Sequence, residues 1–418
     1  MNNNQHPACP NCGTGALTAF CEVSGVPVHS VLLIPTRAEA VDYPRGDIRL
    51  GVCGDCAFVS NLAFDPSVHH YGGRYEATQA YSGTFNTFHR CLATELVQRF
   101  DLYRRQIIEI GCGQGEFLEL LCEVGGNTGL GFDPAHAPER LSAPPSPRVS
   151  FIHDFYSDRY AQHTADFVVC KMTLEHIPKT SEFVSLVRRA IGERPNTTVF
   201  FQVPDFQRIL EETAFWDIYY EHCSYFSAAS LARLFRSAGF EILDLWRDYG
   251  DQYLMVTARP KAGAAQPPLP AEDAASQVSQ ATSQFDKILQ SRLAVWRNLI
   301  HKMTAQGHRV VLWGGGSKGV AFLTMVGIST EHIAYVVDIN PHKSRAFLAG
   351  TGQQVVSPLQ LRSIRPDAVI VMNPMYREEV SRDLHDLGLS PELLCATDDP
   401  VSIATKLNSV AAFSHPKP

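Results

Sequence analysis

The stretch Arg105-Gln-Ile-Ile-Glu-Ile-Gly-Cys-Gly-Gln-Gly-Glu-Phe-Leu118 decides the fold class of this 418-residue chain. It begins with a short apolar run typical of a buried strand, passes through a glycine loop and ends at the start of a helix. Gly111, Gly113 and Gly115 let the backbone turn tightly and approach a ligand without interference from a Cβ atom. Because the N–H groups at a helix start favour an anionic or carboxylate-bearing ligand, we expect the loop to bind one.

Short apolar runs and helical stretches alternate around this loop. Four runs are short, apolar and often β-branched, as buried strands are; they are residues 107–110, 128–132, 167–170 and 198–203. The stretches at residues 85–100 and 181–191 have the spacing of amphipathic helices. This alternation predicts an α/β domain in which a parallel sheet is covered by helices on both faces.

Polar and aromatic residues at the ends of these strands form a candidate cofactor site. Glu109 precedes the loop, and Asp133 ends the second strand, where a carboxylate can accept both hydroxyl protons of a ribose. Near a further strand expected before the run at 167–170, Asp154 can accept from an adenine amino group while Phe155 lies against the ring. Lys171, directly after the run at 167–170, completes the candidate set.

The order of these features resembles class I S-adenosylmethionine-dependent methyltransferases. The resemblance implies a Rossmann-like domain that binds S-adenosylmethionine through the residues just named. The alternative is an α/β domain that binds another nucleotide. A dinucleotide-binding fold prefers the pattern G-x-G-x-x-G, whereas this loop reads G-C-G-Q-G.

Length and composition limit the class of protein. A chain with 45% hydrophobic residues and this length can form two or three cores. The net charge of -7 and the lack of any Lys or Arg run disfavour a nucleic-acid-binding protein. The apolar runs are strand-length and the N-terminus is polar, so we expect no membrane span and no signal peptide. Scattered thiols among the 11 cysteines indicate a cytoplasmic protein.

Composition shifts divide the chain into three domains and one linker. We expect a zinc-binding domain at residues 1–80, the methyltransferase domain at 81–260, and a linker with a connecting helix at 261–305. A C-terminal Rossmann-like α/β domain follows at residues 306–410, with strands expected at 309–313, 334–337 and 368–372. The connecting helix is expected at about 271–306.

Two C-x-x-C pairs predict a structural zinc site in the N-terminal domain. Cys9 and Cys12 form the first pair, and Cys53 and Cys56 form the second. Each pair can make a knuckle whose thiolates converge on one ion, and two knuckles complete a closed tetrahedral site. The alternatives are thiols that merely pack, or a redox pair.

The segment Trp216-Asp-Ile-Tyr-Tyr-Glu-His-Cys-Ser-Tyr-Phe226 carries the residues best suited to acid–base chemistry. It follows a predicted strand, and loops at the carboxyl ends of strands face the cofactor in such folds. Glu221 and His222 are adjacent there, and a histidine beside a carboxylate can act as a general base near neutral pH. The alternative is an aromatic helix edge with a solvated Glu–His pair.

Four features in this order resemble the three-domain sugar C-methyltransferases, which act on nucleotide-activated 4-keto sugars. They are the four-cysteine module, the cofactor domain, the Tyr219-x-Glu221-His222 segment and the C-terminal α/β domain. The resemblance implies that His222 removes the proton next to the ketone, that Glu221 orients or assists it, and that Tyr219 contacts the acceptor. Such a base is needed because a carbon next to a carbonyl is not nucleophilic until it is deprotonated.

The same resemblance implies two further acceptor-side residues. In that family a tyrosine before the cofactor domain approaches the acceptor, and Tyr75 and Tyr81 are the candidates here. Their spacing does not decide between them. His176, after the run at 167–170, matches a family active-site histidine.

A second glycine loop lies in the C-terminal domain, at Val310-Val-Leu-Trp-Gly-Gly-Gly-Ser-Lys-Gly319. It contains a literal G-x-G-x-x-G, and an acidic residue ends the next strand, as in dinucleotide-binding folds. The loop is interpreted in three ways: it binds a nicotinamide dinucleotide, it binds the diphosphate of a nucleotide-linked acceptor, or it only packs. The resemblance favours the second. The candidate substrate-binding residues are Gly314, Gly316, Ser317, Lys318, Asp338 and Asn373.

Taken together, these patterns predict an S-adenosylmethionine-dependent C-methyltransferase that carries a structural zinc ion. Its expected partner is a small-molecule acceptor, a nucleotide-linked keto sugar, and neither nucleic acid nor membrane. One alternative is a methyltransferase that acts on another small metabolite in natural-product biosynthesis. An alternative of another class is an NAD-dependent oxidoreductase that uses the C-terminal glycine loop.

Overall fold

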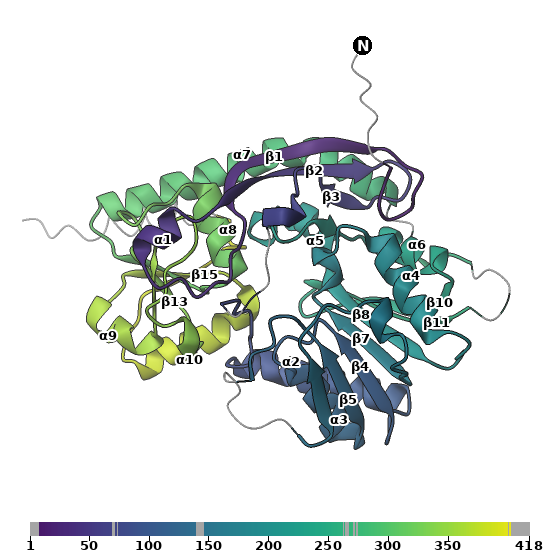
Figure 1. Ribbon diagram of the computed structural model, residues 1–418. Coiled ribbons are helices and arrows are strands. Elements are labelled where there is room, and N and C mark those ends of the chain that lie inside the picture. The colour runs from purple at the N-terminus through teal and green to yellow at the C-terminus, as the bar shows by residue number, and fades with distance from the viewer. Residues whose placement is uncertain are drawn as a thin grey trace, which may run out of the picture. The chain divides into compact units, whose positions relative to one another are not determined.

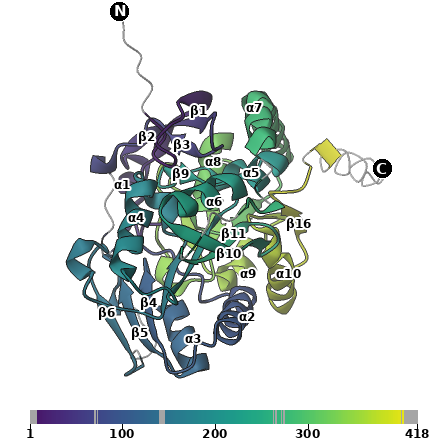
Figure 2. The ribbon, with the colours of Figure 1, turned by 90° about the vertical axis from the view of Figure 1, so that its right-hand side faces the viewer.

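The strand before the first glycine loop is an interior strand of a seven-stranded sheet (Figures 1 and 2). The computed structural model describes residues 8–68, 72, 74–138, 146–261, 263, 267–270, 272, 275–399 and 401–402. The chain divides into two compact units. The first unit comprises Met1–Glu22, Asp47–Glu211 and Tyr220–Ser283, and the second comprises Val23–Gly46, Glu212–Tyr219 and Gln284–Pro418.

The large sheet of the first unit has the strand order β10-β11-β8-β7-β4-β5-β6. The strands are β4 (Gln106–Ile110), β5 (Thr128–Phe132), β6 (Val149–Ile152), β7 (Phe167–Lys171), β8 (Thr198–Pro204), β10 (Phe240–Asp248) and β11 (Tyr253–Pro260). Strands β4 to β8 pair in parallel, and the four predicted runs are confirmed as β4, β5, β7 and β8. Figure 1 shows these four strands side by side.

The prediction of a wholly parallel sheet is wrong at one edge. Strand β11 pairs antiparallel with both β8 and β10. The short turn between β10 and β11 contains Tyr249, Gly250 and Asp251, all with positive φ. A tight turn can join only antiparallel strands, because a parallel pair needs a long crossover connection.

Helices of the first unit pack on this sheet. They are α2 (Gly83–Arg99), α3 (Glu116–Gly125), α4 (Thr180–Ile191), α5 (Phe206–Glu212) and α6 (Ala228–Ser237), and two of them confirm the predicted stretches at 85–100 and 181–191. Helix α2 packs on α3, which contacts β4, β5 and β6, whereas α4 packs on α6. Side chains such as Ile108, Ile110 and Val168 form one core with Val184 of α4 and Leu231 of α6.

A four-stranded sheet joins the N-terminal strands to the predicted acceptor segment. Its order is β1 (Leu17–Pro27), β2 (Arg45–Cys53), β3 (Val59–Asn61) and β9 (Ser224–Tyr225). The pairing of Val59 with Tyr225 links residues that are far apart in the chain. The short helix α1 (Arg37–Val41) and the 3-10 turn η1 (Pro66–Val68) lie on either side of β2 and β3 in the sequence.

The second unit contains a parallel sheet of order β14-β13-β12-β15-β16. Its strands are β12 (Val310–Trp313), β13 (Tyr335–Val337), β14 (Gln354–Val356), β15 (Ala368–Val371) and β16 (Glu392–Cys395), which confirms the three that were predicted. Its helices are α8 (Ser317–Val326), α9 (Leu361–Ile364) and α10 (Arg377–Asp386). The expected connecting helix is α7 (Ala275–Ala305), and none of the described helices is long and apolar enough to cross a membrane.

Residues Val23–Gly46 pack within the second unit rather than with the rest of the N-terminal segment. Ile34 forms a β-bridge with Phe347, and Arg45 donates to the carbonyl of Gly350. The hydroxyl of Ser30 donates to that of Ser317, 2.8 Å away. Part of the N-terminal segment therefore contacts the C-terminal glycine loop directly.

Candidate active site

The first glycine loop needs glycine at Gly111. Its φ is +71°, and a Cβ atom there would lie 2.0 Å from the hydroxyl oxygen of Thr173. Gly115, with φ of +91°, caps the N-terminus of α3. The loop therefore carries the chain from β4 into α3 with its backbone exposed to a ligand, as the sequence pattern predicts.

Asp133 ties this loop to the end of β5. Its Oδ2 accepts from the backbone N–H of Gly113 at 2.9 Å, and its Oδ1 accepts from that of Ala135 at 2.7 Å. Burial raises the pKa of Asp133, while these two backbone hydrogen bonds lower it. Each carboxylate oxygen has a second lone pair, so the group can still accept ribose hydroxyls.

A cavity of about 370 Å³ opens beside the loop, a volume within the usual range for small-molecule sites. Predicted cofactor residues among those that line it are Glu109, Gly111, Gly113, Asp133, Asp154, Phe155 and Lys171. Predicted acceptor-side residues among them are Tyr75 and His176. The chain segments behind these residues come from the ends of β4, β5 and β7, which meet at one edge of the sheet.

Lys171 has a partner that the sequence did not indicate. Its Nζ lies 2.7 Å from Nε2 of His89, on α2, and 3.7 Å from the ring centroid of Phe117. Burial lowers the pKa of His89 to about 2 and that of Lys171 to about 8, and it raises the pKa of Glu109 to about 8. The neutral imidazole therefore accepts from the lysine. No local motif marks His89, because its role depends on the packing of α2 on α3.

Asp154 and Phe155 lie at the cavity, with Asp154 already engaged. Its Oδ2 accepts from the hydroxyl of Tyr160 at 2.6 Å and pairs with Arg159. The ring of Phe155 is 58% exposed, although it lines the cavity. An apolar ring left this open is available to contact a bound group.

A cluster of two histidines and a glutamate adjoins the cavity. Glu175 and His176 belong to the 3-10 turn η4 (Leu174–His176), directly after β7. The rings of His176 and His222 lie 4.9 Å apart, edge to face, and Oε1 of Glu175 lies 4.0 Å from Nε2 of His222. Nδ1 of His176 lies 3.0 Å from the carbonyl oxygen of Glu221 and donates to it. The three side chains of Glu175, His176 and His222 therefore form one mostly buried group.

The predicted tyrosines have different positions. Tyr75 lines the cavity, whereas Tyr81 directly precedes Ser82, which caps the N-terminus of α2. Burial, together with nearby carboxylates of which Glu221 is the strongest, raises the pKa of Tyr75 well above its ordinary value. Tyr219 belongs to the second unit, while Glu221 and His222 belong to the first.

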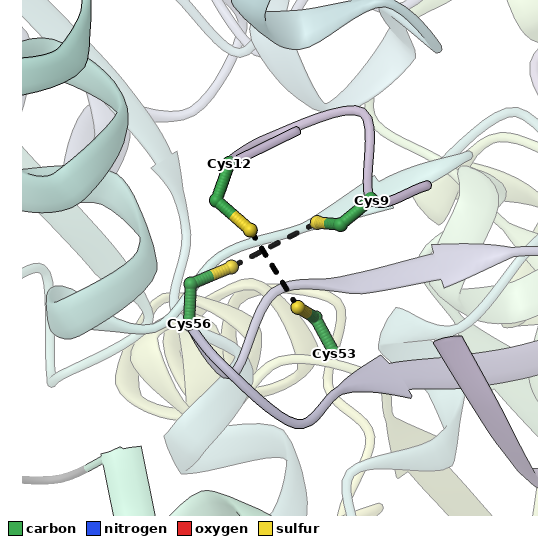
Figure 3. Close-up of side chains that lie close together, drawn as sticks. All are labelled: Cys9, Cys12, Cys53 and Cys56. Atoms are coloured by element: carbon green, nitrogen blue, oxygen red, sulfur yellow. Dashed lines mark hydrogen bonds between the residues drawn. The ribbon is translucent and has the colours of Figure 1, made fainter. Parts of the chain in front are cut away.

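The four cysteines of the C-x-x-C pairs point their sulfur atoms toward one centre (Figure 3). The Sγ atoms of Cys9 and Cys56 are 3.8 Å apart, and those of Cys12 and Cys53 are 3.7 Å apart. Four sulfurs at about 2.3 Å from a zinc ion stand about 3.8 Å from one another in a tetrahedron. The donor set and its spacing therefore fit zinc.

The second glycine loop has its polar groups engaged within the second unit. Asp338 accepts from the N–H of Gly315 at 3.0 Å and from Nζ of Lys343 at 3.3 Å. Lys318 pairs with Asp217. Asn373, which is buried, accepts from the N–H of Met375. The loop thus has the predicted shape, but Asp338 already has a cationic partner.

Two parts of the chain match known protein families. Residues 85–245 match a family described as a methyltransferase domain, and residues 258–389 match the C-methyltransferase C-terminal domain. The chain is 27% identical to the C-methyltransferase NovU of Streptomyces niveus over 79% of this chain and 80% of that protein. It is 29% identical to a ubiquinone biosynthesis O-methyltransferase of Hydrogenovibrio crunogenus over 29% of this chain and 52% of that protein.

Among solved structures, an N,N-8-amino-8-demethyl-D-riboflavin dimethyltransferase of Streptomyces davawensis aligns with a TM-score of 0.35 at 20% identity, covering 42% of this chain and 56% of that one. The two family matches and the long alignment to NovU carry the assignment, because they cover both the cofactor domain and the C-terminal domain. The chain therefore contains a methyltransferase domain and a C-methyltransferase C-terminal domain, and it is an S-adenosylmethionine-dependent C-methyltransferase.

Proposed function

We propose that the enzyme methylates the carbon next to the ketone of a nucleotide-activated deoxysugar, with His222 as the general base. The observation that carries this proposal is the buried group of Glu175, His176 and His222 beside the cofactor cavity. Ligand-type atoms of these three residues lie within 4.8 Å of one another. A C-methyltransferase needs a base at that place, because its acceptor carbon must lose a proton before it can attack.

The imidazole of His222 takes the proton, and the electron pair of the broken C–H bond forms an enolate of the acceptor. The deprotonated carbon would then attack a methyl group, and the bond that holds this group to its donor would break with its electron pair left on the donor. S-adenosylmethionine, when bound, supplies this methyl group on a positively charged sulfur. Tyr219 and either Tyr75 or Tyr81 contact the acceptor, and Glu221 assists His222. Hydrogen-bond donors near the enolate oxygen stabilise its charge.

On the donor side, Asp133 accepts from the ribose hydroxyls, and Asp154 and Phe155 hold the adenine. The backbone of Gly111, Gly113 and Gly115 lies against the rest of the cofactor. Glu109 and Lys171 line the cavity and contact the cofactor, and Lys171 pairs with its carboxylate. The fit is supported by Gly111, which lines the cavity and has no room for a side chain, because a Cβ atom there would lie 2.0 Å from the hydroxyl oxygen of Thr173.

On the acceptor side, we assign the nucleotide diphosphate to the C-terminal domain at residues 306–410. Gly314, Gly316, Ser317, Lys318, Asp338 and Asn373 form the proposed contact set. Lys318 is paired with Asp217, so phosphates would have to compete with that carboxylate. The other proposed boundaries are those predicted: zinc domain at 1–80, methyltransferase domain at 81–260, linker at 261–305.

We assign a structural zinc ion to Cys9, Cys12, Cys53 and Cys56, since a closed site of four thiolates leaves no open position for chemistry. Metal analysis is expected to give one zinc per chain. The outcome against this assignment is a Cys9→Ser variant that folds normally while the purified wild type holds far less than one equivalent.

Deuterium exchange tests the proposed base. The protein is incubated with S-adenosylhomocysteine and a nucleotide-activated 4-keto deoxysugar in deuterated buffer, and mass spectrometry follows deuterium at the carbon next to the ketone. We expect exchange by the wild type and a loss of about 10²-fold or more in His222→Gln. Equal rates in the two proteins would refute the assignment of His222.

A further inference from the structure

Glu175 is a buried carboxyl group that the mechanism above does not use. The residue is 1% exposed, and neither carboxyl oxygen has a hydrogen-bond partner among the residues that the structure describes. A buried polar group without such a partner is costly and uncommon in folded proteins. A residue with this cost and no packing reason to be acidic is a candidate for a functional role.

The imidazole of His222 is a basic group close to this carboxyl. Oε1 of Glu175 lies 4.0 Å from Nε2 of His222, and the His222 side chain is as buried as the glutamate. Hydrogen-bond distance is roughly 2.7–3.2 Å, so a shift of about 1 Å joins the two groups. Catalytic hydrogen bonds are often longer than this in proteins without bound substrate and shorten in the complex.

Both partners are held by the fold. Glu175 sits in the turn η4 after β7, and its carbonyl oxygen accepts from Sγ of Cys223 at 3.6 Å. His222 precedes β9, which pairs with β3, and its ring lies 6.0 Å from that of Tyr225. The glutamate and the histidine are therefore brought together by two different strands.

We infer that Glu175 is the positioning residue for His222: its carboxylate holds the Nε2 proton and stabilises the imidazolium that forms when Nδ1 takes the proton of the acceptor. The inference rests on the proposed function, since it needs His222 as the base. Before the step the pair consists of a carboxylate and a neutral imidazole. Afterwards it is a carboxylate and an imidazolium, and the negative charge lost by the pair appears on the enolate.

The surrounding charges agree with this role. Burial raises the pKa of Glu175 to about 8. Cys170 of β7, Cys223 and Tyr75 also face it, and burial raises the pKa of each, so all three stay uncharged near neutral pH. His176 donates its Nδ1 proton to the backbone carbonyl of Glu221, which fixes the orientation of its ring. When Glu175 is ionised, its carboxylate is therefore the group that balances a proton arriving on His222.

Glu175 and His222 titrate as one unit. The direction of the pH dependence follows from the raised pKa of Glu175. The active form has Glu175 ionised, so kcat/KM is expected to rise with pH through an acidic limb near 8. In Glu175→Gln the remaining base is an imidazole without its carboxylate, so that limb moves to lower pH. A purely structural role would lower the rate without moving the limb in this direction.

The experiment compares Glu175→Gln with the matched carboxyl-to-amide change Glu182→Gln, on the exposed face of α4. Deuterium exchange into a nucleotide-activated 4-keto deoxysugar gives kcat and KM against pH. Nitrogen-15 NMR gives the tautomer and titration of His222 without any acceptor. S-adenosylhomocysteine binding by calorimetry shows that the variants are folded. We expect Glu175→Gln to keep this binding, to lose about 10²-fold or more in kcat and to lower the titration midpoint of His222.

The possible outcomes separate the two proposals. The inference is overturned, and the proposed base is kept, by one result. In that result Glu175→Gln has the wild-type kcat, the wild-type acidic limb and the wild-type titration of His222, while His222→Gln is inactive. Wild-type exchange in His222→Gln overturns both. If Glu175→Gln does not fold, Glu175→Asp is used instead. This variant is expected to keep the acidic limb of the wild type at a lower kcat. An acidic limb moved to lower pH would count against the inference. A second equivalent of metal per chain, bound by Glu175, His176 and His222, would also overturn it, because a metal would occupy the base.

Discussion

The two glycine loops of this enzyme are built alike and differ in how their acidic residue is balanced. In each, an aspartate at the end of the next strand accepts from a loop N–H: Asp133 from Gly113, and Asp338 from Gly315. Asp338 also forms an ion pair with Nζ of Lys343, at 3.3 Å, whereas Asp133 lines a cavity of about 370 Å³. Desolvation of a carboxylate is costly unless something balances it.

Under the proposed function, the loop beside Asp133 binds a ligand, whereas the charge of Asp338 at the second loop is already paired within the chain. The burial cost at Asp133 can be offset when ribose hydroxyls donate to it. At Asp338 the chain itself offsets this cost. The second loop can therefore pack or hold a phosphate group at its helix, but its aspartate is less suited to bind a ribose. Three substitutions and one ligand-binding measurement test this comparison.

The largest expected effect is at the balancing lysine. In Lys343→Met, Asp338 keeps its backbone donors but loses its cation in a mostly buried site, so we expect unfolding of the second unit to become easier by about 3 kcal/mol. Chemical denaturation measures this. The matched change Lys179→Met removes an exposed ion pair with Glu182 and is expected to cost less than about 1 kcal/mol. Equal losses in the two variants would contradict the balancing role.

The next effect is at Gly111. In Gly111→Ala the new Cβ meets the hydroxyl of Thr173 at 2.0 Å at a positive φ, so we expect a cost of about 2–3 kcal/mol and a loss of S-adenosylhomocysteine affinity of at least 30-fold. Gly113→Ala is the control, because it has a positive φ but no atom within 4 Å of the new Cβ. It is expected to cost about 1–2 kcal/mol. Calorimetry of S-adenosylhomocysteine binding checks both, and an equal affinity loss in the two would show that only φ matters.

The parts of this comparison that the sequence predicted are local ones. The strand before each loop, the glycines and the following acidic residue all lie within short stretches whose periodicity and turn chemistry are readable. What could not be predicted depends on contacts between distant residues. His89 beside Lys171 and Glu175 beside His222 have no local pattern, because they are set by tertiary packing.

The same limit explains the topology. The antiparallel β10–β11 hairpin could not be told from a further parallel strand by apolar content alone, and the pairing of Val59 with Tyr225 joins residues more than 150 positions apart. Predictions from strand-length runs identify elements, whereas the order and direction of the strands depend on turns and long-range pairing.

A third effect is on donor affinity. In Asp133→Asn, hydrogen bonds between a charged acceptor and ribose hydroxyls become neutral ones, so S-adenosylhomocysteine affinity is expected to fall by about 1.5–3 kcal/mol. Asp338→Asn is expected to leave it unchanged. Burial raises the pKa of Asp133, and only its ionised form accepts from both hydroxyls. Wild-type affinity should therefore fall as pH falls through that raised pKa, and Asp133→Asn should lack this dependence. Calorimetry over a pH series decides.

The smallest expected effect is that of NAD on thermal stability. A ligand that binds only the folded state raises the unfolding free energy by RT ln(1 + [L]/Kd), or about 2.7 kcal/mol when its concentration is 100 times Kd. S-adenosylhomocysteine at such an excess should raise the unfolding temperature clearly, while NAD at the same concentration should shift it by less than about 1 °C, because Asp338 is already paired with Lys343. A stabilisation by NAD that disappears in Asp338→Asn would mean that the second loop binds a dinucleotide after all. The lysine would then be a group that a ribose displaces rather than a permanent counter-ion.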